Sequence, residues 1–240
     1  MFELIARMKA RSDCQKSFSQ LGEDRIIKFL LDTFGIQRCR YLDIGAHHPR
    51  RLSNTYLFYT LGGSGVLIEP NRSMASLISE ARPRDLCLNV GLAGEFRASV
   101  PFYVMKSDTL STFSKREAER MVSECGESIV EVRSVEVRTP ESVLSENFSN
   151  DLNLVSLDVE GLEMEILESF DLRKYRPEVF CIETISYAVD GKGVKSSVLA
   201  PFMASHGYRI FADTHVNTIF VDQARWESLG RVRCRAARMA

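Results

Sequence analysis

Short apolar runs alternate along the chain with longer stretches whose apolar positions recur at helical spacing. The short runs cover residues 40–44, 65–69, 86–92, 152–157 and 179–182. They are largely continuous in apolar character, as expected of strands that are buried on both faces of a sheet. Alternation of such strands with helices predicts an α/β layer architecture with a mostly parallel sheet.

The stretches between these strands have the periodicity of helices. They predict helices over residues 19–34, 53–61, 72–81, 161–170 and 196–206. A shorter helix begins after Thr139, which can cap it, with Pro140 at the first helical position. Near the end of the chain, residues 208–211 and 218–221 predict a closing hairpin.

The length of 240 residues suits a single domain. Within residues 1–240 we distinguish a helical lead-in at 17–39, a less regular insertion at 100–139 and a basic tail at 223–240. Long excursions between core elements tend to carry function. We therefore expect the insertion, with Ser111 and Thr112, to shape an acceptor site and to act as a lid.

Composition narrows the class of protein. Hydrophobic residues make up 45% and charged residues 26%, which is typical of a globular enzyme rather than a disordered chain. The formal net charge of −1 argues against nucleic acid as a partner. No apolar run has the length of about 20 residues that a spanning helix needs. The six cysteines have no metal-type spacing, so we expect reduced thiols and a cytoplasmic location.

Basic residues gather near both ends of the chain. They are Arg7, Lys9, Arg11, Lys16, Arg225, Arg231, Arg233, Arg235 and Arg238. We expect two solvated ends, and a contact with an acidic acceptor, a partner or a membrane surface is the alternative.

Every core strand ends in a carboxylate or a carboxamide, which are Asp43, Glu69, Asn89, Asp158 and Glu183. The same strand ends also present Gly45, Ala46 and His47, Pro70 and Asn71, Gly91, Glu160 and Thr184. In open α/β sheets, ligands bind beyond the carboxyl ends of the strands. The sequence therefore predicts a binding site built from these residues.

The first two strands indicate the class of cofactor. Gly45 allows a tight turn close to a ligand, and Glu69 can accept hydrogen bonds from both hydroxyls of a ribose. The loop after Gly45 lacks the further glycines of a pyrophosphate site, and the chain has no GxxxxGK[ST] pattern. A nucleoside cofactor without phosphates fits these features, and S-adenosylmethionine is such a molecule.

Several segments resemble the FkbM-type methyltransferases. They are SFSQLGED (17–24), YLDIGA (41–46), SNTY (53–56), GVLIEPN (65–71), LST (110–112) and LDVEGLE (157–163). The resemblance covers roughly residues 17 to 222 and implies a class I methyltransferase fold, a Rossmann-like three-layer sandwich. It also implies S-adenosylmethionine as cofactor and, usually, O-methylation of hydroxyls on sugars, glycans or secondary metabolites. His47, His48 and Pro49 depart from the Asn and Gly that many members have after Asp-x-Gly-Ala.

If the chain is such a methyltransferase, most of the residues at the strand ends belong to the cofactor site. The expected contacts are Asp43, Gly45, Ala46, Asn54, Glu69, Pro70, Asn71, Asn89, Gly91 and Asp158. Asn54 is either a helix cap or a support of the cofactor loop, and Asn89 is either an adenine contact or a turn residue.

The candidates for the base that accepts the proton of an acceptor hydroxyl are Asp158, Glu160, Glu183 and His47. Asp158 and Glu183 on adjacent strand ends raise Mg²⁺ as an alternative, which two visible ligands do not favour. N- or C-methylation, a non-catalytic cofactor-binding module and a nicotinamide-dependent oxidoreductase remain rival functions. We expect the acceptor to be a small molecule or a glycan, but the sequence does not identify it. The sequence does not indicate the oligomeric state either.

Overall fold

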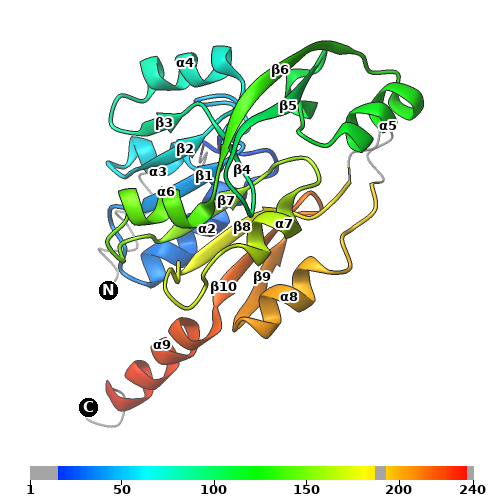
Figure 1. The fold of residues 1–240 in the computed structure, drawn as a ribbon. Coiled ribbons are helices and arrows are strands. Elements are labelled where there is room, and N and C mark those ends of the chain that lie inside the picture. The colour runs from blue at the N-terminus through cyan, green and yellow to red at the C-terminus, as the bar shows by residue number, and fades with distance from the viewer. Residues whose placement is uncertain (1–15, 187–192, 237–240) are drawn as a thin grey trace.

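The computed structural model describes residues 16–186 and 193–236, which fold around one large sheet (Figure 1). Its strands, in order across the sheet, are β3 (Leu86–Leu88), β2 (Ser64–Ile68), β1 (Arg40–Ile44), β7 (Leu154–Leu157), β8 (Val179–Glu183), β10 (Asn217–Asp222) and β9 (Tyr208–Asp213). β10 pairs antiparallel with both β8 and β9, whereas the other pairs of neighbouring strands in this sheet are parallel. The predicted mostly parallel sheet with a closing antiparallel hairpin is confirmed.

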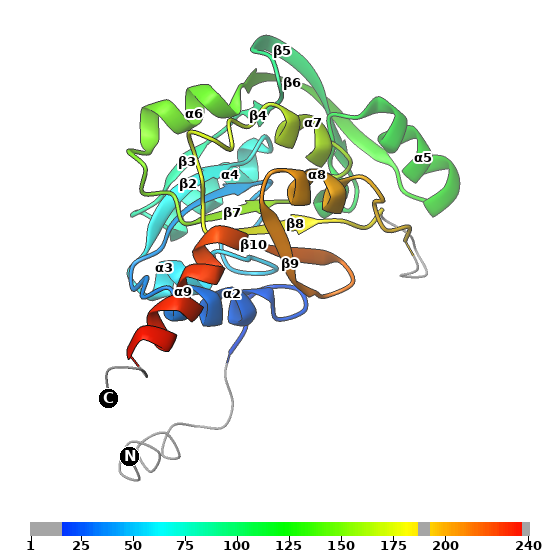
Figure 2. The same cartoon turned by 90° about the horizontal axis from the view of Figure 1, so that it is seen from below.

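Helices cover both faces of this sheet, because side chains along each strand point alternately to opposite faces. Tyr41 packs with α2 (Glu23–Thr33), α3 (Tyr56–Thr60), α4 (Arg72–Ala81) and α9 (Gln223–Ala236). Leu42 and Ile44 pack with α6 (Pro140–Asn147), α7 (Glu163–Glu168) and α8 (Leu199–Ser205). The result is the predicted three-layer sandwich, in which α2, α3 and α9 lie together on one side (Figure 2).

A second sheet of three strands, with order β4-β6-β5, contains the insertion and the residues that precede it. The strands are β4 (Gly91–Leu92), β6 (Ile129–Arg138) and β5 (Arg97–Met105), which reach beyond the large sheet and carry η1 (Asp108–Leu110) and α5 (Lys115–Cys125) (Figure 1). The prediction of one strand over 86–92 was wrong. Asn89 leaves the strand pattern to donate hydrogen bonds to the carbonyls of Glu69 and Pro70, and Gly91–Leu92 then pair with β6.

The C-terminal segment differs from the expected solvated tail. Residues 223–236 form α9, and the Trp226 ring packs edge-on against Phe34 and Phe211. Arg225 donates a hydrogen bond to the Phe34 carbonyl, so one of the predicted tail cations holds this helix to the core. The basic residues before Lys16 and Arg238 lie outside the described residues. Among the helices of residues 16–186 and 193–236, none has both the length and the hydropathy to cross a bilayer.

Arg82, at the end of α4, is fully buried beside the strand ends. Its Nε lies 2.7 Å from Asp85 Oδ2, and its Nη2 donates to Tyr41 Oη at 3.2 Å and to Thr55 Oγ1 at 3.0 Å. Thr55 in turn donates to the buried carboxylate of Asp43. Arg82 therefore compensates two carboxylates in the interior.

We expect Arg82→Met to lower the free energy of unfolding by about 3–5 kcal/mol, because it leaves the buried Asp85 carboxylate without its cation. Urea denaturation of the two proteins measures this difference. Lys28→Met is the control, since Lys28 pairs with Asp32 on the surface of α2 and such a pair contributes less than about 1 kcal/mol. Equal effects of the two substitutions would contradict a structural role of Arg82.

Candidate active site

A cavity of about 220 Å³ lies at the carboxyl ends of the central strands. The segments that follow β1, β2, β7 and β8 line one side of it, and η1 with residues 109–113 of the insertion line the other. Of the residues predicted to contact the cofactor, those that line it are Gly45, Ala46, Asn54, Glu69, Pro70, Gly91 and Asp158. The large sheet and the insertion thus share one site.

Gly45 allows the β1 loop to pass against the β7 loop. It has a φ of 82°, and a Cβ built on it would lie 1.7 Å from the Asp158 carbonyl oxygen. Its N–H and that of Ala46 donate to the Ile68 carbonyl at 3.0 and 3.1 Å. Only glycine fits this position, because the backbone is left-handed and the neighbouring backbone leaves no space.

Glu69 fixes the two loops beside the cavity. Its Oε2 accepts a hydrogen bond from the His47 N–H at 2.7 Å, and its Oε1 accepts one from the Asn71 N–H at 2.6 Å. Burial raises the pKa of this carboxyl to about 7. Each carboxylate oxygen keeps a second acceptor site, so Glu69 can still bind two hydroxyls of a ligand.

Three predicted cofactor residues lie outside the cavity lining. Asp43 accepts a hydrogen bond from Thr55, and burial raises its pKa. Asn71 caps α4 by accepting from the Ser73 N–H, and Asn89 donates to backbone carbonyls near Glu69. The structure therefore places these three where they support the loops that do line the cavity.

Two buried asparagines each present an unused acceptor. Asn54 is 7% exposed and donates to Ser156 Oγ at 3.2 Å, whereas Asn217 is 2% exposed and donates to Glu23 Oε1 at 3.0 Å. Within the described part of the chain, neither Oδ1 atom has a hydrogen-bond partner, and both residues line the cavity. A buried acceptor without a donor is costly, which indicates a ligand that donates to it or a cation that binds it.

Three carboxylates meet at one end of the cavity. Asp158, Glu160 and Glu183 each offer an oxygen within 4.8 Å of the other two. Burial raises the pKa of Asp158 to about 7, and it raises the pKa values of Glu160 and Glu183 well above their usual range, with further increases from their neighbours. Glu160 reaches this cluster from a left-handed backbone conformation, with a φ of 54°.

Glu163 has a different role from these three. Its Oε1 accepts hydrogen bonds from the N–H groups of Val159 and Gly161, both at 3.1 Å. It thus holds the loop between β7 and α7, which presents Glu160 to the cavity.

The two histidines that follow Ala46 make separate contacts. His47 Nε2 lies 3.2 Å from Asp108 Oδ1 without a hydrogen-bond partner among the described residues, so the β1 loop and the insertion are neighbours in the cavity lining. His48 Nδ1 accepts from the N–H groups of Arg50 and Arg51, at 3.1 and 2.9 Å. His48 therefore organises its own turn, whereas His47 lines the site.

A second cavity, of about 460 Å³, lies on the other side of Glu160 and Glu183, which line both cavities. Its walls come from α5 and from residues 184–186 and 194–199. Ser186, Ser196 and Ser197 contribute hydroxyls to this wall. Sequence analysis did not predict this cavity, because its walls come from segments that are distant in the sequence and meet only in the fold.

Asn217 is a site residue that sequence reasoning missed. It begins β10, far along the chain from the other strand ends, and β10 is antiparallel. Its amino end therefore meets the carboxyl end of β8, where Asn217 pairs with Glu183. Polar character at the start of a strand was the only signal in the sequence, and it is equally typical of a turn.

Comparison with known proteins gives one family match and several distant structures. A family model described as the methyltransferase FkbM domain matches residues 43–210. The crystal structure of monomeric WbdD has 11% identity and a TM-score of 0.47, over 92% of this chain and 44% of that one. This chain therefore spans less than half the length of the WbdD chain.

Two further structures are a 1,6-didemethyltoxoflavin-N1-methyltransferase from Burkholderia thailandensis and a precorrin-6y C5,15-methyltransferase from Geobacter metallireducens. The first has 9% identity and a TM-score of 0.40, over 84% of this chain and 77% of that one. The second has 15% identity and a TM-score of 0.39, over 86% of this chain and 91% of that one. None of the curated proteins compared with this chain matches it significantly. Because these TM-scores lie below 0.5, the family assignment rests on the family model.

Glu69 should make stability depend on pH. Its carboxyl has a pKa near 4.5 when unfolded and about 7 when folded, so the folded state binds the proton more tightly between these values. Its contribution is therefore present at acidic pH and is lost as the pH rises through 7, by about 3 kcal/mol at roughly 1.4 kcal/mol per pKa unit.

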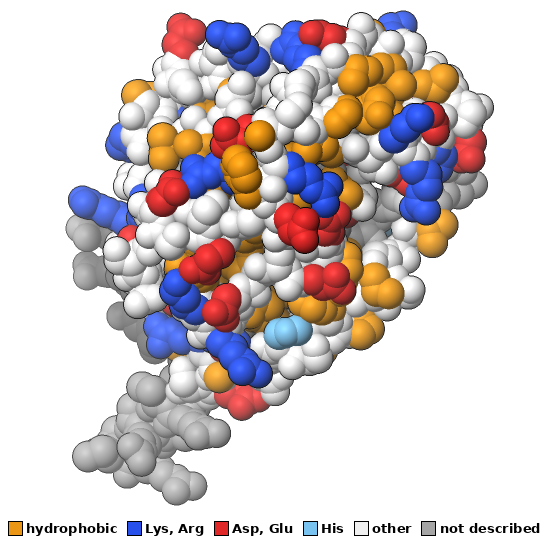
Figure 3. All heavy atoms as spheres, viewed as in Figure 1, with side chains coloured by type: hydrophobic (Ala, Val, Ile, Leu, Met, Phe, Trp, Pro, Cys, Tyr) orange, Lys and Arg blue, Asp and Glu red, His pale blue; other side chains and the backbone are white. Residues whose placement is uncertain are grey.

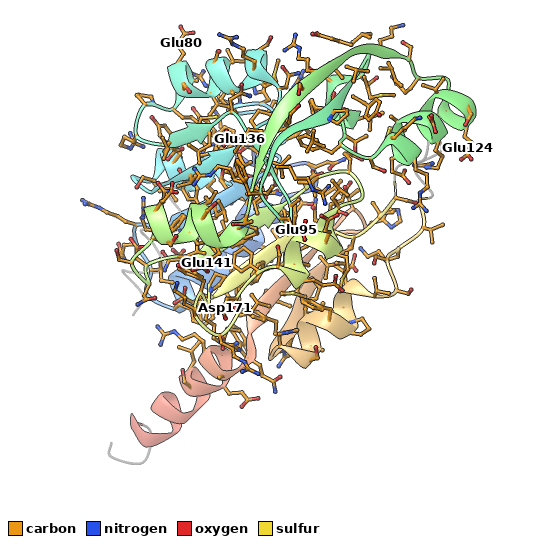
Figure 4. All side chains as sticks on the ribbon, viewed as in Figure 1. Glu80, Glu95, Glu124, Glu136, Glu141 and Asp171 are labelled. Atoms are coloured by element: carbon orange, nitrogen blue, oxygen red, sulfur yellow. The ribbon has the colours of Figure 1, made fainter. Side chains whose placement is uncertain are left out.

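Urea denaturation of the ligand-free protein between pH 5 and 8 measures this effect, and we expect Glu69→Gln to remove that part of the slope. Glu80→Gln is the control, because Glu80 extends from the outer face of α4 (Figure 4). If the wild type and Glu69→Gln have the same slope, Glu69 does not change its protonation on folding.

Proposed function

The chain belongs to the FkbM family of S-adenosylmethionine-dependent methyltransferases, and on that premise we propose that it methylates a hydroxyl oxygen of a small-molecule or glycan acceptor. The observation that carries this proposal is the shared wall of the two cavities. Glu160 and Glu183 line both, so a group bound on one side can react with a group bound on the other next to a carboxylate.

The first cavity has the chemistry that the cofactor needs. Glu69 offers acceptors for the ribose hydroxyls, and Gly45 lets the backbone approach the ligand closely. The unused Oδ1 of buried Asn54 suits the ammonium group of the methionine moiety. Asp158 adds negative charge for the sulfonium, so these residues fit a cationic nucleoside without phosphates.

The second cavity is the proposed acceptor site. Its serine hydroxyls and the carboxylates of Glu160 and Glu183 can donate to and accept from several hydroxyls, which suits a polyhydroxylated acceptor. Lys195 in the same wall is held by Asp213 Oδ1 at 2.9 Å and by the His215 carbonyl at 2.7 Å. These two contacts hold the Lys195 side chain within the wall.

The reaction needs alignment and a proton acceptor. The cofactor supplies a methyl group that its sulfonium already activates toward displacement. The protein aligns the acceptor oxygen with this methyl and excludes water from both. As the O–C bond forms and the S–C bond breaks, the hydroxyl proton passes to a carboxylate of the cluster. Glu160 and Glu183 line both cavities, and burial raises the pKa of each above its usual range, which makes each a stronger base than an exposed carboxylate.

Further parts of the proposal concern the whole chain. We take it as a single domain in which the insertion covers the cofactor, since Ser111, Thr112 and Asp108 line the first cavity. His47 is the alternative base, and its position beside Asp108 favours a role in holding the insertion instead.

The free thiols of buried Cys39 and Cys181 agree with a cytoplasmic location. N- or C-methylation is the second candidate function within this family.

Glu69→Gln should weaken S-adenosylmethionine binding by about 10- to 100-fold, because hydrogen bonds to a charged acceptor contribute roughly 1.5–3 kcal/mol. For the wild type, affinity should rise from pH 6 to pH 8 as Glu69 ionises through its pKa of about 7. Isothermal calorimetry measures both effects, with Glu80→Gln as the surface control. No binding by the wild type would exclude the methyltransferase function, and full affinity in Glu69→Gln would exclude the role of this carboxylate.

Glu160→Gln and Asp158→Asn should lower the rate of O-methylation by about 10²- to 10⁴-fold, the usual contribution of a positioned base. The assay follows label from S-adenosylmethionine into acceptors of a cell extract, and mass spectrometry then identifies the product. Glu95→Gln, at a side chain that is 81% exposed and lines neither cavity, is the matched control (Figure 4). An amine acceptor needs little base catalysis, so retained transfer by both variants would favour N-methylation.

A further inference from the structure

The proposed base explains only one carboxylate of the cluster, because a single proton acceptor needs one carboxylate. The cluster has three, from Asp158, Glu160 and Glu183. We propose that these three carboxylates bind a divalent metal cation, with the side-chain oxygen of Asn217 as a fourth ligand. The role of this cation in methyl transfer rests on the proposed function, whereas its binding can be measured independently.

The spacing of the three oxygens suits a hard cation. They lie within 4.8 Å of one another. Two ligands on opposite sides of one ion are separated by twice the metal–oxygen distance, which is about 4.2 Å for Mg²⁺ and about 4.8 Å for Ca²⁺. Small side-chain rotations therefore bring all three to coordination distance. Carboxylate oxygens are also the ligands that Mg²⁺, Mn²⁺ and Ca²⁺ prefer.

The charge of the cluster is not balanced by nearby side chains. Among the residues that the structure describes, no lysine or arginine forms an ion pair with Asp158, Glu160 or Glu183. Arg120, the cation that affects Glu160, is paired with Glu117 at 2.8 Å and with Glu124 at 3.6 Å. The buried Asp85 carboxylate, in contrast, has Arg82 as a partner. A divalent cation would favour the ionised form of the three carboxylates and would compensate their charge.

Asn217 is the independent observation that indicates a ligand here. It pairs with Glu183 across β8 and β10, so the two side chains leave the sheet on the same face. Glu23 accepts a hydrogen bond from its Nδ2, and this contact fixes the orientation of the amide, because the reverse would set oxygen against a carboxylate. The Oδ1 is thereby directed away from Glu23, and it is buried without a donor in the cavity that the three carboxylates also line.

The site lies where the acceptor hydroxyl would react. Glu160 and Glu183 line both cavities, so a cation between them can contact an acceptor oxygen in the second cavity. An ion in octahedral coordination keeps further positions for water or acceptor oxygens. A hydroxyl bound to such an ion would lose its proton more readily, and a carboxylate oxygen of the cluster that does not coordinate the ion would accept it, as in the proposed function. The oxygen then attacks the methyl group, and the electron pair of the broken S–C bond stays on sulfur.

The test is a titration of the EDTA-treated full chain with Mn²⁺, followed by the electron paramagnetic resonance signal of the free ion. We expect one saturable site per chain, from which Mg²⁺ displaces Mn²⁺. Glu183→Gln and Asp158→Asn should each weaken Mn²⁺ binding at least 10-fold. Glu95→Gln removes the same charge from a side chain that is 81% exposed, and it should bind Mn²⁺ like the wild type (Figure 4).

Circular dichroism establishes which variants are folded, and Glu160→Gln and Asn217→Leu provide further variants if one of the others is not. Absence of saturable Mn²⁺ binding in the wild type overturns the proposal, as does equal binding by the wild type and every folded cluster variant. Calorimetry with S-adenosylmethionine in EDTA separates the two proposals. Cofactor binding without Mn²⁺ binding refutes the metal site alone, and Mn²⁺ binding without cofactor binding refutes the methyltransferase function alone.

Discussion

Gly45 and the carbonyl of Asp158 approach each other so closely that no other residue fits at position 45. This contact joins the ends of β1 and β7, the two central strands of the parallel part of the sheet. The β1 loop then lies against Glu69, and the β7 loop turns to present Glu160. The absence of a side chain at position 45 thus allows both the β1 loop and the β7 loop to reach the same cavity.

This arrangement buries several ionisable side chains, and they are accommodated in two different ways. Beneath the loops, Arg82 balances Asp85 and lies close to Asp43 through Thr55. At the cavity, burial and mutual repulsion raise the pKa values of the carboxylates instead. Surface charges are mixed, with acidic and basic side chains interspersed on the face that carries α6 and α7 (Figure 3).

The sequence predicts the large sheet well because each of its strands and helices is determined by residues that are adjacent in the chain. β1 and α4 have the predicted bounds, and Asp158 and Glu183 lie at the predicted strand ends. The prediction fails where the position of a residue depends on segments that are distant in the sequence. β4 leaves the run 86–92 to pair with β6, and Asn217 reaches the site only because β10 is antiparallel. The convergence of Glu160 with its neighbours depends on a left-handed backbone that periodicity does not report.

The two cavities differ in what builds them, although they share Glu160 and Glu183. The first depends on strand ends that also hold the core together. The second is walled by α5 and by residues 184–186 and 194–199, which connect core elements without forming them. If the second cavity takes the acceptor as proposed, the choice of acceptor would be set by these connecting segments, separately from the strand ends that build the first cavity.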